Sequence, residues 1–330
     1  MNAKCKMQNA KLPVGSRNNS HFSIRGSRFT PHNPGFSNNK GMALVLTLLV
    51  VAILTALVVE FAYGVYVSTS ALHNWQTSQK LSVAARSAVI LGSRLISENA
   101  SQYSYTYPGL FELSQKIPFE DLDGTMSIRI EDENAKFNLN TLRGLSFTMG
   151  SDKGKAPYNS FVRLLKALGL KTDIADRISY WVDSGTEHRP SDGKSATKNA
   201  TLDSVDELLL IPGIDREGYE RLKPYVTIYS DKTININSAD IPVLMSLSDS
   251  MTQEMADTII KYRESAPFEN ISDITRLPGF GPAGTGLLGP IVVRGTAFHV
   301  IATAESGGIQ RIIESVLDGS GKFVYYWKEI

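Results

Sequence analysis

The chain has 330 residues and a formal net charge of +1 at pH 7, with 42% hydrophobic and 20% charged residues. This length is enough for two ordinary domains in addition to a membrane segment. The only cysteine, Cys5, lies near the N-terminus, which excludes disulfide stabilisation and thiolate chemistry from the rest of the chain.

Positive charge is concentrated at the N-terminus. Residues 1–40 contain seven Lys or Arg and no Asp or Glu, whereas the rest of the chain holds 27 basic and 33 acidic residues. This leader is rich in Asn, Ser, Gly and Pro and has no periodic apolar pattern, so we expect it to be disordered.

An apolar run from Met42 to Val59 follows the leader, interrupted only by Thr47 and Thr55. Eighteen helical residues span roughly 27 Å, which matches the hydrocarbon thickness of a bilayer. We therefore expect a single inner-membrane helix over about residues 42–62. Because basic residues precede it, the N-terminus should be cytoplasmic and the C-terminal bulk should lie across the membrane, in the periplasm.

The helix is expected to continue beyond the membrane, because no proline occurs between Met42 and Tyr107. Apolar residues recur there at spacings of mostly three, four and seven, which predicts one apolar stripe on a stalk helix. The members of this stripe are Val65, Leu72, Trp75, Leu81, Ala84, Ala88, Leu91 and Leu95. The predicted transmembrane and stalk helix covers residues 42–100 and ends near Glu98–Asn99.

Strand patterns occur on both sides of a long central region. The segment TMSIRIE (125–131) alternates apolar and polar residues, as strands do. Two further runs, FHVIATAES (298–306) and QRIIESVLD (310–318), are joined by Gly307-Gly308, a pair suited to a two-residue hairpin turn. The aromatic C-terminal segment KFVYYWKEI is predicted to form another strand.

The central region contains an internal repeat of three segments in the same order. The matched pairs are FNLNTL (137–142) with ININSA (234–239), ADRISYWVDS (175–184) with ADTIIKYRES (256–265), and LDSVDELLLIPGI (202–214) with FENISDITRLPGF (268–280). Each copy is predicted to form a helix, a turn and a second helix that ends at a Pro-Gly pair. Predicted N-caps are Asp203 and Ser204 in the first copy, and Asn270 and Ser272 in the second.

The two Pro-Gly turns resemble helix-hairpin-helix motifs, in which glycine amides at a helix N-terminus hold a DNA phosphate. Phosphate binding also needs nearby Lys or Arg, and the segment PGFGPAGTGLLGP (278–290) contains neither. We therefore favour structural helical turns and expect no nucleic-acid partner. A membrane-anchored DNA-binding protein of the competence type is the alternative.

Lys40-Gly41 before a long apolar helix resembles the processing site of type IV prepilins, which a prepilin peptidase cuts on the cytoplasmic side. The resemblance implies cleavage between Gly41 and Met42, with Met42 as an N-methylated mature terminus. Type IV pilins usually carry Glu at the fifth mature position, where this chain has Leu46. On this stretch alone, an uncleaved signal anchor is the alternative.

As a whole, residues 40–330 resemble the minor pseudopilin K family of type II secretion systems, a type IV pilin-like family. The resemblance rests on KGMALVLTLLVVAILT with its non-acidic fifth position, KFNLNTL, ISYWVDS, LDSVDELLLIPGI, ININSADIPVL and FHVIATAESGGIQRIIESVL. It implies an α+β fold in which the N-terminal helix packs on a small antiparallel pilin-like sheet. Residues 1–41 would form the leader, 101–136 and 291–330 the sheet domain, and 137–290 a duplicated α-helical insertion of the SAM-like or helix-hairpin-helix-like type.

The resemblance also implies a function in assembly. A pseudopilin K is expected at the tip of a periplasmic pseudopilus, where it initiates assembly for protein export. The implied partners are minor pseudopilins I, J and H, the major pseudopilin G, the prepilin peptidase and the inner-membrane secretion platform. A bulky insertion can be accommodated at the tip, because no further subunit packs above it. For the same reason, no N-terminal amine of a subunit above needs a carboxylate partner, so Leu46 is tolerated there. A minor pilin of a type IV pilus is an alternative.

Calcium is the one ligand that the family resemblance implies, on acidic loop residues after the WVD segment. Here Asp183, Glu187 and Asp192 offer hard oxygen ligands on a loop with Gly, Pro and Ser. The Gly-Ala-Glu motif usual in the family is absent, and a solvated charged loop is the alternative.

No catalytic constellation is evident in the sequence. The five His residues are scattered, and neither a glycine-rich phosphate loop in a strand–helix context nor a Ser or Cys nucleophile motif occurs. We therefore expect the protein not to be an enzyme and to use no cofactor other than calcium.

Overall fold

The computed structural model describes residues 40–106, 111–119, 121–144, 156–185 and 197–330. The chain divides into two compact units, residues 1–65 and 66–330. Residues 1–39 of the predicted leader lie outside the described residues, and the described part of the first unit is entirely helical. The sheet and the other helices belong to the second unit.

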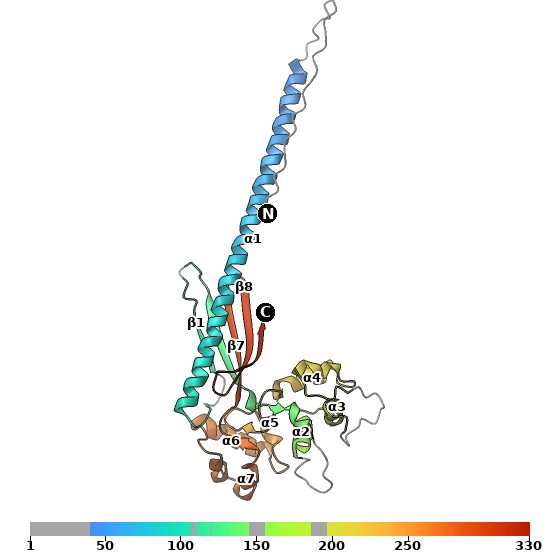
Figure 1. Cartoon of the computed structure of the whole chain (residues 1–330), viewed down its shortest axis with the longest axis vertical. Coiled ribbons are helices and arrows are strands. Elements are labelled where there is room, and N and C mark those ends of the chain that lie inside the picture. Colours follow the sequence, from blue (N-terminus) through green and yellow to red (C-terminus); the bar gives the residue numbers. More distant parts are fainter. Residues whose placement is uncertain (1–39, 107–110, 120, 145–155, 186–196) are drawn as a thin grey trace, which may run out of the picture. The chain divides into compact units, whose positions relative to one another are not determined.

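Helix α1 runs from Lys40 to Gln102 without interruption (Figure 1). The absence of proline allows this length, and the internal glycines, Gly64 and Gly92, each cost only about 1 kcal/mol relative to alanine. The helix ends three residues beyond Asn99, close to its predicted end.

The second unit contains a five-stranded antiparallel sheet in the order β1-β2-β7-β8-β9 (Figure 1). The strands are β1 (Phe111–Lys116), β2 (Thr125–Asp132), β7 (Ala297–Ser306), β8 (Ile309–Asp318) and β9 (Val324–Glu329). The predicted hairpin is confirmed: Gly307 and Gly308 turn β7 into β8 with φ values of 56° and 80°. Such angles strain residues with a Cβ, so glycine is the natural choice at both positions.

One face of the sheet packs on α1. Alternate residues of β2 and β7 are buried on that face, among them Met126, Ile128, Val300 and Ala302. A Cβ on Gly92 would lie 2.9 Å from Val300 Cγ1, so the helix lies tightly against the sheet at this glycine. The sheet and α1 share one hydrophobic core.

The region between β2 and β7 is mainly helical and has a hydrophobic core of its own. Its helices are α2 (Ala156–Ala167), α3 (Asp173–Val182), α4 (Arg216–Leu222), α5 (Ile241–Met245), α6 (Gln253–Ser265) and α7 (Gly281–Leu287). Short 3-10 helices are η1 (Glu133–Ala135), η2 (Leu139–Leu142), η4 (Val205–Leu210), η5 (Lys223–Tyr225) and η6 (Ile271–Arg276). We refer to this region, residues 137–293, as the inserted body.

Two short parallel strand pairs close the two halves of the inserted body. Strand β3 (Phe137–Asn138) pairs with β4 (Val226–Thr227), and β5 (Ile234–Asn235) pairs with β6 (Ile291–Val292). Because β6 pairs with β5 and Val293 belongs to the core of the inserted body, that body extends three residues past the predicted boundary at 290.

The internal repeat is also visible in the hydrogen bonding. Asn140 accepts a hydrogen bond from the Leu202 amide at 2.7 Å and donates to the Leu202 carbonyl at 3.1 Å. Asn237 makes the same pair of bonds with Phe268, at 2.8 and 3.0 Å. The sequence alignment of the repeat matches both asparagines, and it matches Leu202 with Phe268.

The helical prediction for the repeat was wrong in one respect. The segments before the two Pro-Gly pairs are the 3-10 helices η4 and η6, and the regular helices α4 and α7 follow those pairs. Gly213 and Gly279 have φ values of 91° and 84°, so each Pro-Gly pair reverses the chain instead of ending an α-helix. The N-caps are Ser204 and Asn270, and Asn270 forms a capping box with Asp273.

Candidate functional site

The predicted processing segment lies at the start of α1. Lys40 is its first residue, and Gly41, Met42 and Leu46 follow within the first two turns. Met42 and Leu46 are each 63% exposed, and a Cβ on Gly41 would meet no neighbouring atom. This segment of the first unit is therefore exposed. Cleavage between Gly41 and Met42 stays a prediction.

One described helix is long and apolar enough to cross a membrane. It covers Gly41–Gln102, and its most apolar 18-residue window has a mean hydropathy of 3.0 with none of that window buried. Large side chains from Met42 to Val67 are exposed. In water such a surface would be unfavourable, which is consistent with a lipid environment for this part of the helix.

The second half of α1 has two different faces. The face toward the sheet buries Leu81, Ala84, Ala85, Ala88 and Val89. The small alanine side chains allow the helix backbone to lie close to the strands. This face, which includes Gly92, packs on the protein's own sheet.

The opposite face of α1 carries exposed aliphatic side chains. Leu72, Val83 and Ile90 are 54%, 53% and 57% exposed. Their spacings of eleven and seven residues return to almost the same helix angle, about 160° to 180° away from Leu81. We call Leu72, Val83 and Ile90 the outer stripe.

The single apolar stripe predicted on the stalk was therefore wrong. Its members Val65, Leu72 and Trp75 are exposed, whereas Leu81, Ala84 and Ala88 are buried against the sheet. Leu72 and Leu81 are nine residues apart, which is two and a half helical turns, so they lie on opposite sides of the helix. The stalk has two apolar faces instead of one.

Edge strand β9 lies beside the outer stripe. The Glu329 carboxylate accepts hydrogen bonds from Ser82 Oγ and, at 2.9 Å, from Arg86. At the other end of the strand, Ser93 Oγ donates to the Gly321 carbonyl at 2.8 Å. Trp327, on the same strand, is 43% exposed.

Hydrogen bonds from Ser82 and Arg86 hold the pKa of Glu329 below its usual range. The carboxylate is therefore ionised at neutral pH and fixes β9 at this end. This attachment could not be predicted from local sequence patterns, because Ser82 and Glu329 are 247 residues apart.

A polar joint connects the sheet to the inserted body at the turn Asp132–Asn134. Asn134 is fully buried, and its side chain donates to Asp231 at 2.9 Å and to the Thr233 carbonyl at 3.1 Å. The Asn134 side-chain oxygen accepts from the amide and hydroxyl of Thr296, at 2.8 and 3.0 Å. One side chain thus joins the entry, the middle and the exit of the inserted body.

Asp132 occupies the same joint and is also buried. Its carboxylate accepts from the Asn134 amide at 2.8 Å, from Asn235 Nδ2 at 2.6 Å and from Ser238 Oγ at 3.0 Å. Burial outweighs these three hydrogen bonds and raises the pKa of Asp132 to about 6. A Cβ on Gly295 would lie 2.4 Å from this carboxylate, so the joint requires glycine at position 295.

Glu133, the next residue, anchors a second set of contacts. It accepts from Thr227 Oγ1 and from Lys136 Nζ, the latter at 2.8 Å, and Lys136 also pairs with Glu131 at 3.3 Å. His299 Nδ1 lies 4.0 Å from the Glu133 carboxylate. Burial lowers the pKa of His299, with Glu133 acting in the opposite direction.

The calcium prediction is only partly covered by the structure. Asp183 follows α3, and its two carboxylate oxygens accept the amides of Gly185 at 3.0 Å and Gly144 at 3.1 Å. Glu187 and Asp192 lie outside the described residues. Among the residues that are described, no group of three His, Cys, Asp or Glu side chains could hold a metal ion. The calcium site therefore stays a prediction.

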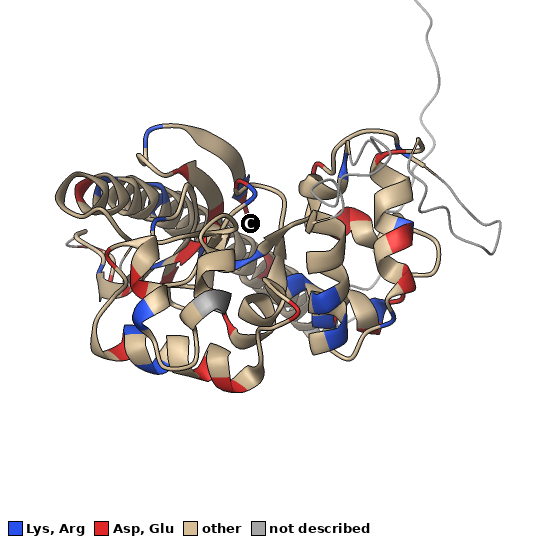
Figure 2. Cartoon of the chain, turned by 90° about the horizontal axis from the view of Figure 1, so that it is seen from below, with Lys and Arg blue, Asp and Glu red and all other residues tan. Residues whose placement is uncertain are grey.

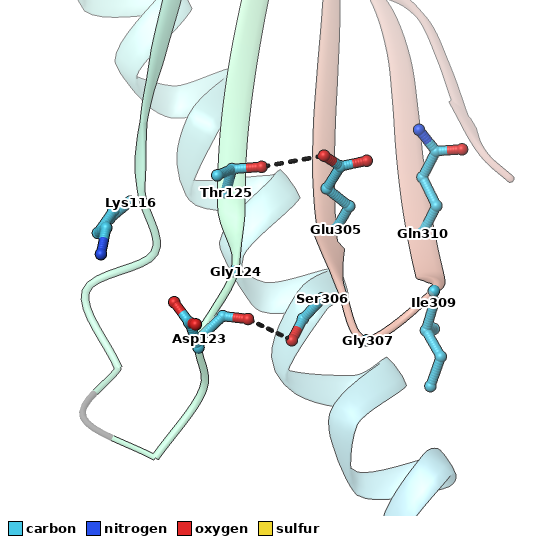
Figure 3. Close-up of a pocket in the computed structure, with 10 residues that line it drawn as sticks. Lys116, Asp123, Gly124, Thr125, Glu305, Ser306, Gly307, Ile309 and Gln310 are labelled. Carbon is cyan, nitrogen blue, oxygen red and sulfur yellow. Dashed lines mark hydrogen bonds between the residues drawn. The ribbon is translucent and has the colours of Figure 1, made fainter.

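An open pocket lies at the turn end of the sheet, between the β1–β2 and β7–β8 connections (Figure 3). Its charged lining residues are Lys116, Asp123 and Glu305. Glu305 accepts a hydrogen bond from Thr125 at 3.2 Å, and Ser306 donates to the Asp123 carbonyl at 2.7 Å. The lining contains no His or Cys, and its carboxylates show no pairing of a nucleophile with a base, so the pocket offers no recognisable catalytic arrangement.

The Pro-Gly turns are poorly suited to holding DNA. The Arg177 guanidinium lies where a Cβ of Gly213 would be, donates to the Pro212 carbonyl at 2.8 Å and bonds Asp173 at 3.2 Å. At the second turn the nearby Arg276 pairs with Asp273 at 3.1 Å. Lys and Arg are interspersed with Asp and Glu over both halves of the inserted body (Figure 2). At both turns the nearby arginine is already held by protein acceptors, and a phosphate would have to compete with them.

Comparison with known proteins places this architecture in a family. Two sequence profiles, both described as type II secretion system protein K, match residues 135–231 and 234–293. Together they cover the inserted body, including both copies of the repeat. Over these residues the chain matches the type II secretion system protein K family.

Relatives of the chain carry the same description. A type II secretion system protein K of Pseudomonas aeruginosa is 28% identical over 303 residues, covering 84% of this chain and 88% of the relative. The protein K of Klebsiella pneumoniae is 29% identical over 219 residues, covering 60% of this chain and 65% of the relative. The similarity to the first relative spans nearly the whole protein K, so it is not confined to the inserted body.

A solved structure supports the fold. A chain in the crystal structure of the GspK-GspI-GspJ complex from the type 2 secretion system of enterotoxigenic Escherichia coli superposes with a TM-score of 0.59. It is 18% identical, and the match covers 79% of this chain and 99% of that chain. The predicted α+β fold, with its long N-terminal helix, antiparallel sheet and extra helices, is confirmed.

Proposed function

We propose that this protein K is a minor pseudopilin that sits at the tip of a periplasmic pseudopilus and initiates its assembly for protein export. The observation that carries the proposal is the two-faced stalk. One face of α1 is used by the protein's own sheet, and the outer stripe, Leu72, Val83 and Ile90, is exposed. Burying such side chains against another helix contributes about 1.5–3 kcal/mol each.

The proposed partners at the outer stripe are the minor pseudopilins I and J. The GspK-GspI-GspJ complex is known for the Escherichia coli system, and its similarity to this chain supports the same assembly here. Minor pseudopilin H, the major pseudopilin G and the inner-membrane secretion platform are further proposed partners. The energy for assembly would come from apolar packing, and no catalysis by this chain is required.

Co-purification tests this proposal. The full chain is co-expressed with pseudopilins I and J, extracted in detergent and captured by an affinity tag. Ile90→Glu should lower the recovered I and J by about tenfold or more, because it places a charge in the packed stripe. Leu210→Glu is the matched control, since Leu210 is an exposed leucine (66%) of the inserted body. Equal recovery from both variants and the original chain would contradict the proposal.

Processing belongs to the same proposal. Cleavage by a prepilin peptidase between Gly41 and Met42 would release residues 1–41 and leave an N-methylated Met42 as the first residue of the membrane helix. Leu46 would then be the fifth residue, where a tip position tolerates the missing carboxylate. Intact-mass spectrometry of the membrane-extracted protein distinguishes this product from a chain that retains its leader.

Membrane topology and calcium complete the proposal. The basic leader supports a cytoplasmic N-terminus and a periplasmic second unit. Asp183, with Glu187 and Asp192, would provide oxygen ligands to a structural calcium ion. A chelator should then lower the melting temperature of the full chain, and a Asp183→Asn variant should reduce that response. An unchanged melting temperature would contradict the calcium part alone.

A further inference from the structure

We propose that the turn Asp132–Asn134 is an acid-strengthened latch that fixes the inserted body against the sheet. The proposal concerns the attachment of two bodies that each have a hydrophobic core of their own. It is independent of the proposed function, because it requires no partner subunit.

The first observation is that the two bodies have separate hydrophobic cores and are joined at this place by buried polar contacts. The buried hydrophobic residues fall into one cluster of residues 137–293 and another formed by α1 and the sheet. The buried connections at the joint are polar and converge on Asp132, Glu133 and Asn134. Polar contacts are directional, so they fix an orientation where apolar contacts would allow sliding.

The second observation is that Asp132 is a buried carboxylate held by neutral donors. The Asn134 amide, Asn235 Nδ2 and Ser238 Oγ all bond it, and they come from both sides of the joint. Among the described residues no cation forms an ion pair with Asp132, and the like charge of Glu133 acts on it. A buried anion without a cation is costly, and protonation removes that cost.

The other charged groups at the joint do not replace the missing cation. Lys136 is paired with Glu131 and Glu133, and Asp231, on the β4–β5 connection, bonds the Asn134 side chain. From β7, His299 faces Glu133, and burial lowers its pKa, so it is mainly neutral at pH 7. The net charge around Asp132 is therefore negative at neutral pH.

Proton linkage gives the direction of the effect. When the latch opens, Asp132 meets water and its pKa returns toward the ordinary value, whereas in the closed joint it is about 6. The closed form therefore binds the proton more tightly, and acidification favours closure. From pH 7 to pH 5 the equilibrium constant for closing the latch should rise about tenfold. His299, whose closed-state pKa is lowered, acts in the opposite direction.

Hydrogen exchange on the full chain in detergent measures this equilibrium. The reporter amides are those of Asn134, Asn237 and Thr296, each hydrogen-bonded within the joint. After correction for the pH dependence of intrinsic exchange, the protection factors of these amides should be about tenfold higher at pH 5 than at pH 7. The protection factors of the Val300 amide in the sheet and the Ile259 amide in the inserted body should change less, and by similar amounts. Joint protection that is unchanged, or that falls at pH 5, would overturn the latch.

Two variants separate the latch from general stability. Asp132→Asn removes the charge and places an amide donor opposite Asn235, so the joint should be weaker and its protection should no longer rise at low pH. Gly295→Ala should open the joint, because its Cβ would lie 2.4 Å from Asp132, while Gly289→Ala, whose Cβ meets nothing within 4 Å, is the matched control. Retention of the pH response in Asp132→Asn would overturn the assignment of that response to Asp132. His299→Gln tests the opposing contribution of His299 to the same response.

Discussion

Asn140 and Asn237, 97 residues apart, hold the chain with the same two side-chain hydrogen bonds. Each amide group bonds both the N–H and the carbonyl of one residue, Leu202 or Phe268, at the start of the third segment of its repeat. An asparagine can do this because it carries one donor and one acceptor side by side. The repeat of the inserted body is therefore a repeat of hydrogen-bond geometry as well as of sequence.

The two asparagines should differ in their importance for stability. Asn237 is fully buried, whereas Asn140 is partly exposed. Asn237→Ala leaves a backbone N–H and carbonyl unpaired in the core and should cost about 1–3 kcal/mol for each unsatisfied group. Denaturant unfolding monitors the change, and Asn140→Ala should cost less. Asn74→Ala, at an exposed position of α1, is the control and should be nearly neutral.

Gly92 should tolerate no larger side chain. Its missing Cβ would be 2.9 Å from Val300 Cγ1 and 3.6 Å from Ile128 Cγ2. Gly92→Val would overfill this contact and should lower the free energy of unfolding by about 1–3 kcal/mol. Gly64→Ala on the same helix meets no neighbour within 4 Å and serves as the control. Similar stability of Gly92→Val and the original chain would show that α1 lies further from the sheet.

The attachment of β9 to α1 should be sensitive to acid. Since the pKa of Glu329 is lowered in the folded chain, its contribution is present above the unfolded pKa and is lost as pH falls through the folded value. Hydrogen exchange of the β9 amides should accelerate below about pH 4.5 relative to β7. Glu329→Gln should show the faster exchange already at pH 7. If β9 exchange in Glu329→Gln matches the original chain, the Arg86 contact has no such role.

Much of the fold could be predicted from the sequence because the patterns concerned are local. The spanning helix follows from an uninterrupted apolar run, and the β7–β8 hairpin follows from Gly307-Gly308 between alternating residues. The weak strand β1 was missed, since only Leu113 in it is even half-buried, and the sequence therefore has no apolar alternation there. The short strands β3 to β6 have two residues each and are fixed by the parallel pairing of distant segments.

The surfaces that carry the proposed function were less accessible from sequence. The predicted stripe omitted Val83 and Ile90. Their spacings, eleven residues from Leu72 to Val83 and seven from Val83 to Ile90, were not recognised because buried alanines lie between them in the sequence. An angular plot of all apolar residues from 65 to 96 would have separated the two faces. The polar joint gave no local signal, because Asp132, Asn235 and Thr296 meet only through tertiary contacts.

The most direct test of the central claim is a site-specific cross-link from the outer stripe. Cys5 is the only cysteine, so a Cys5→Ser, Ile90→Cys chain carries a single thiol on the stripe. In membranes containing pseudopilins I and J, with a cysteine placed along the stalk helix of I, mild oxidation should give a disulfide-linked K–I heterodimer. Glu254→Cys, exposed on α6, should give none. Cross-linking from Glu254→Cys but not from Ile90→Cys, at any position along the stalk of I, would contradict assembly through the outer stripe.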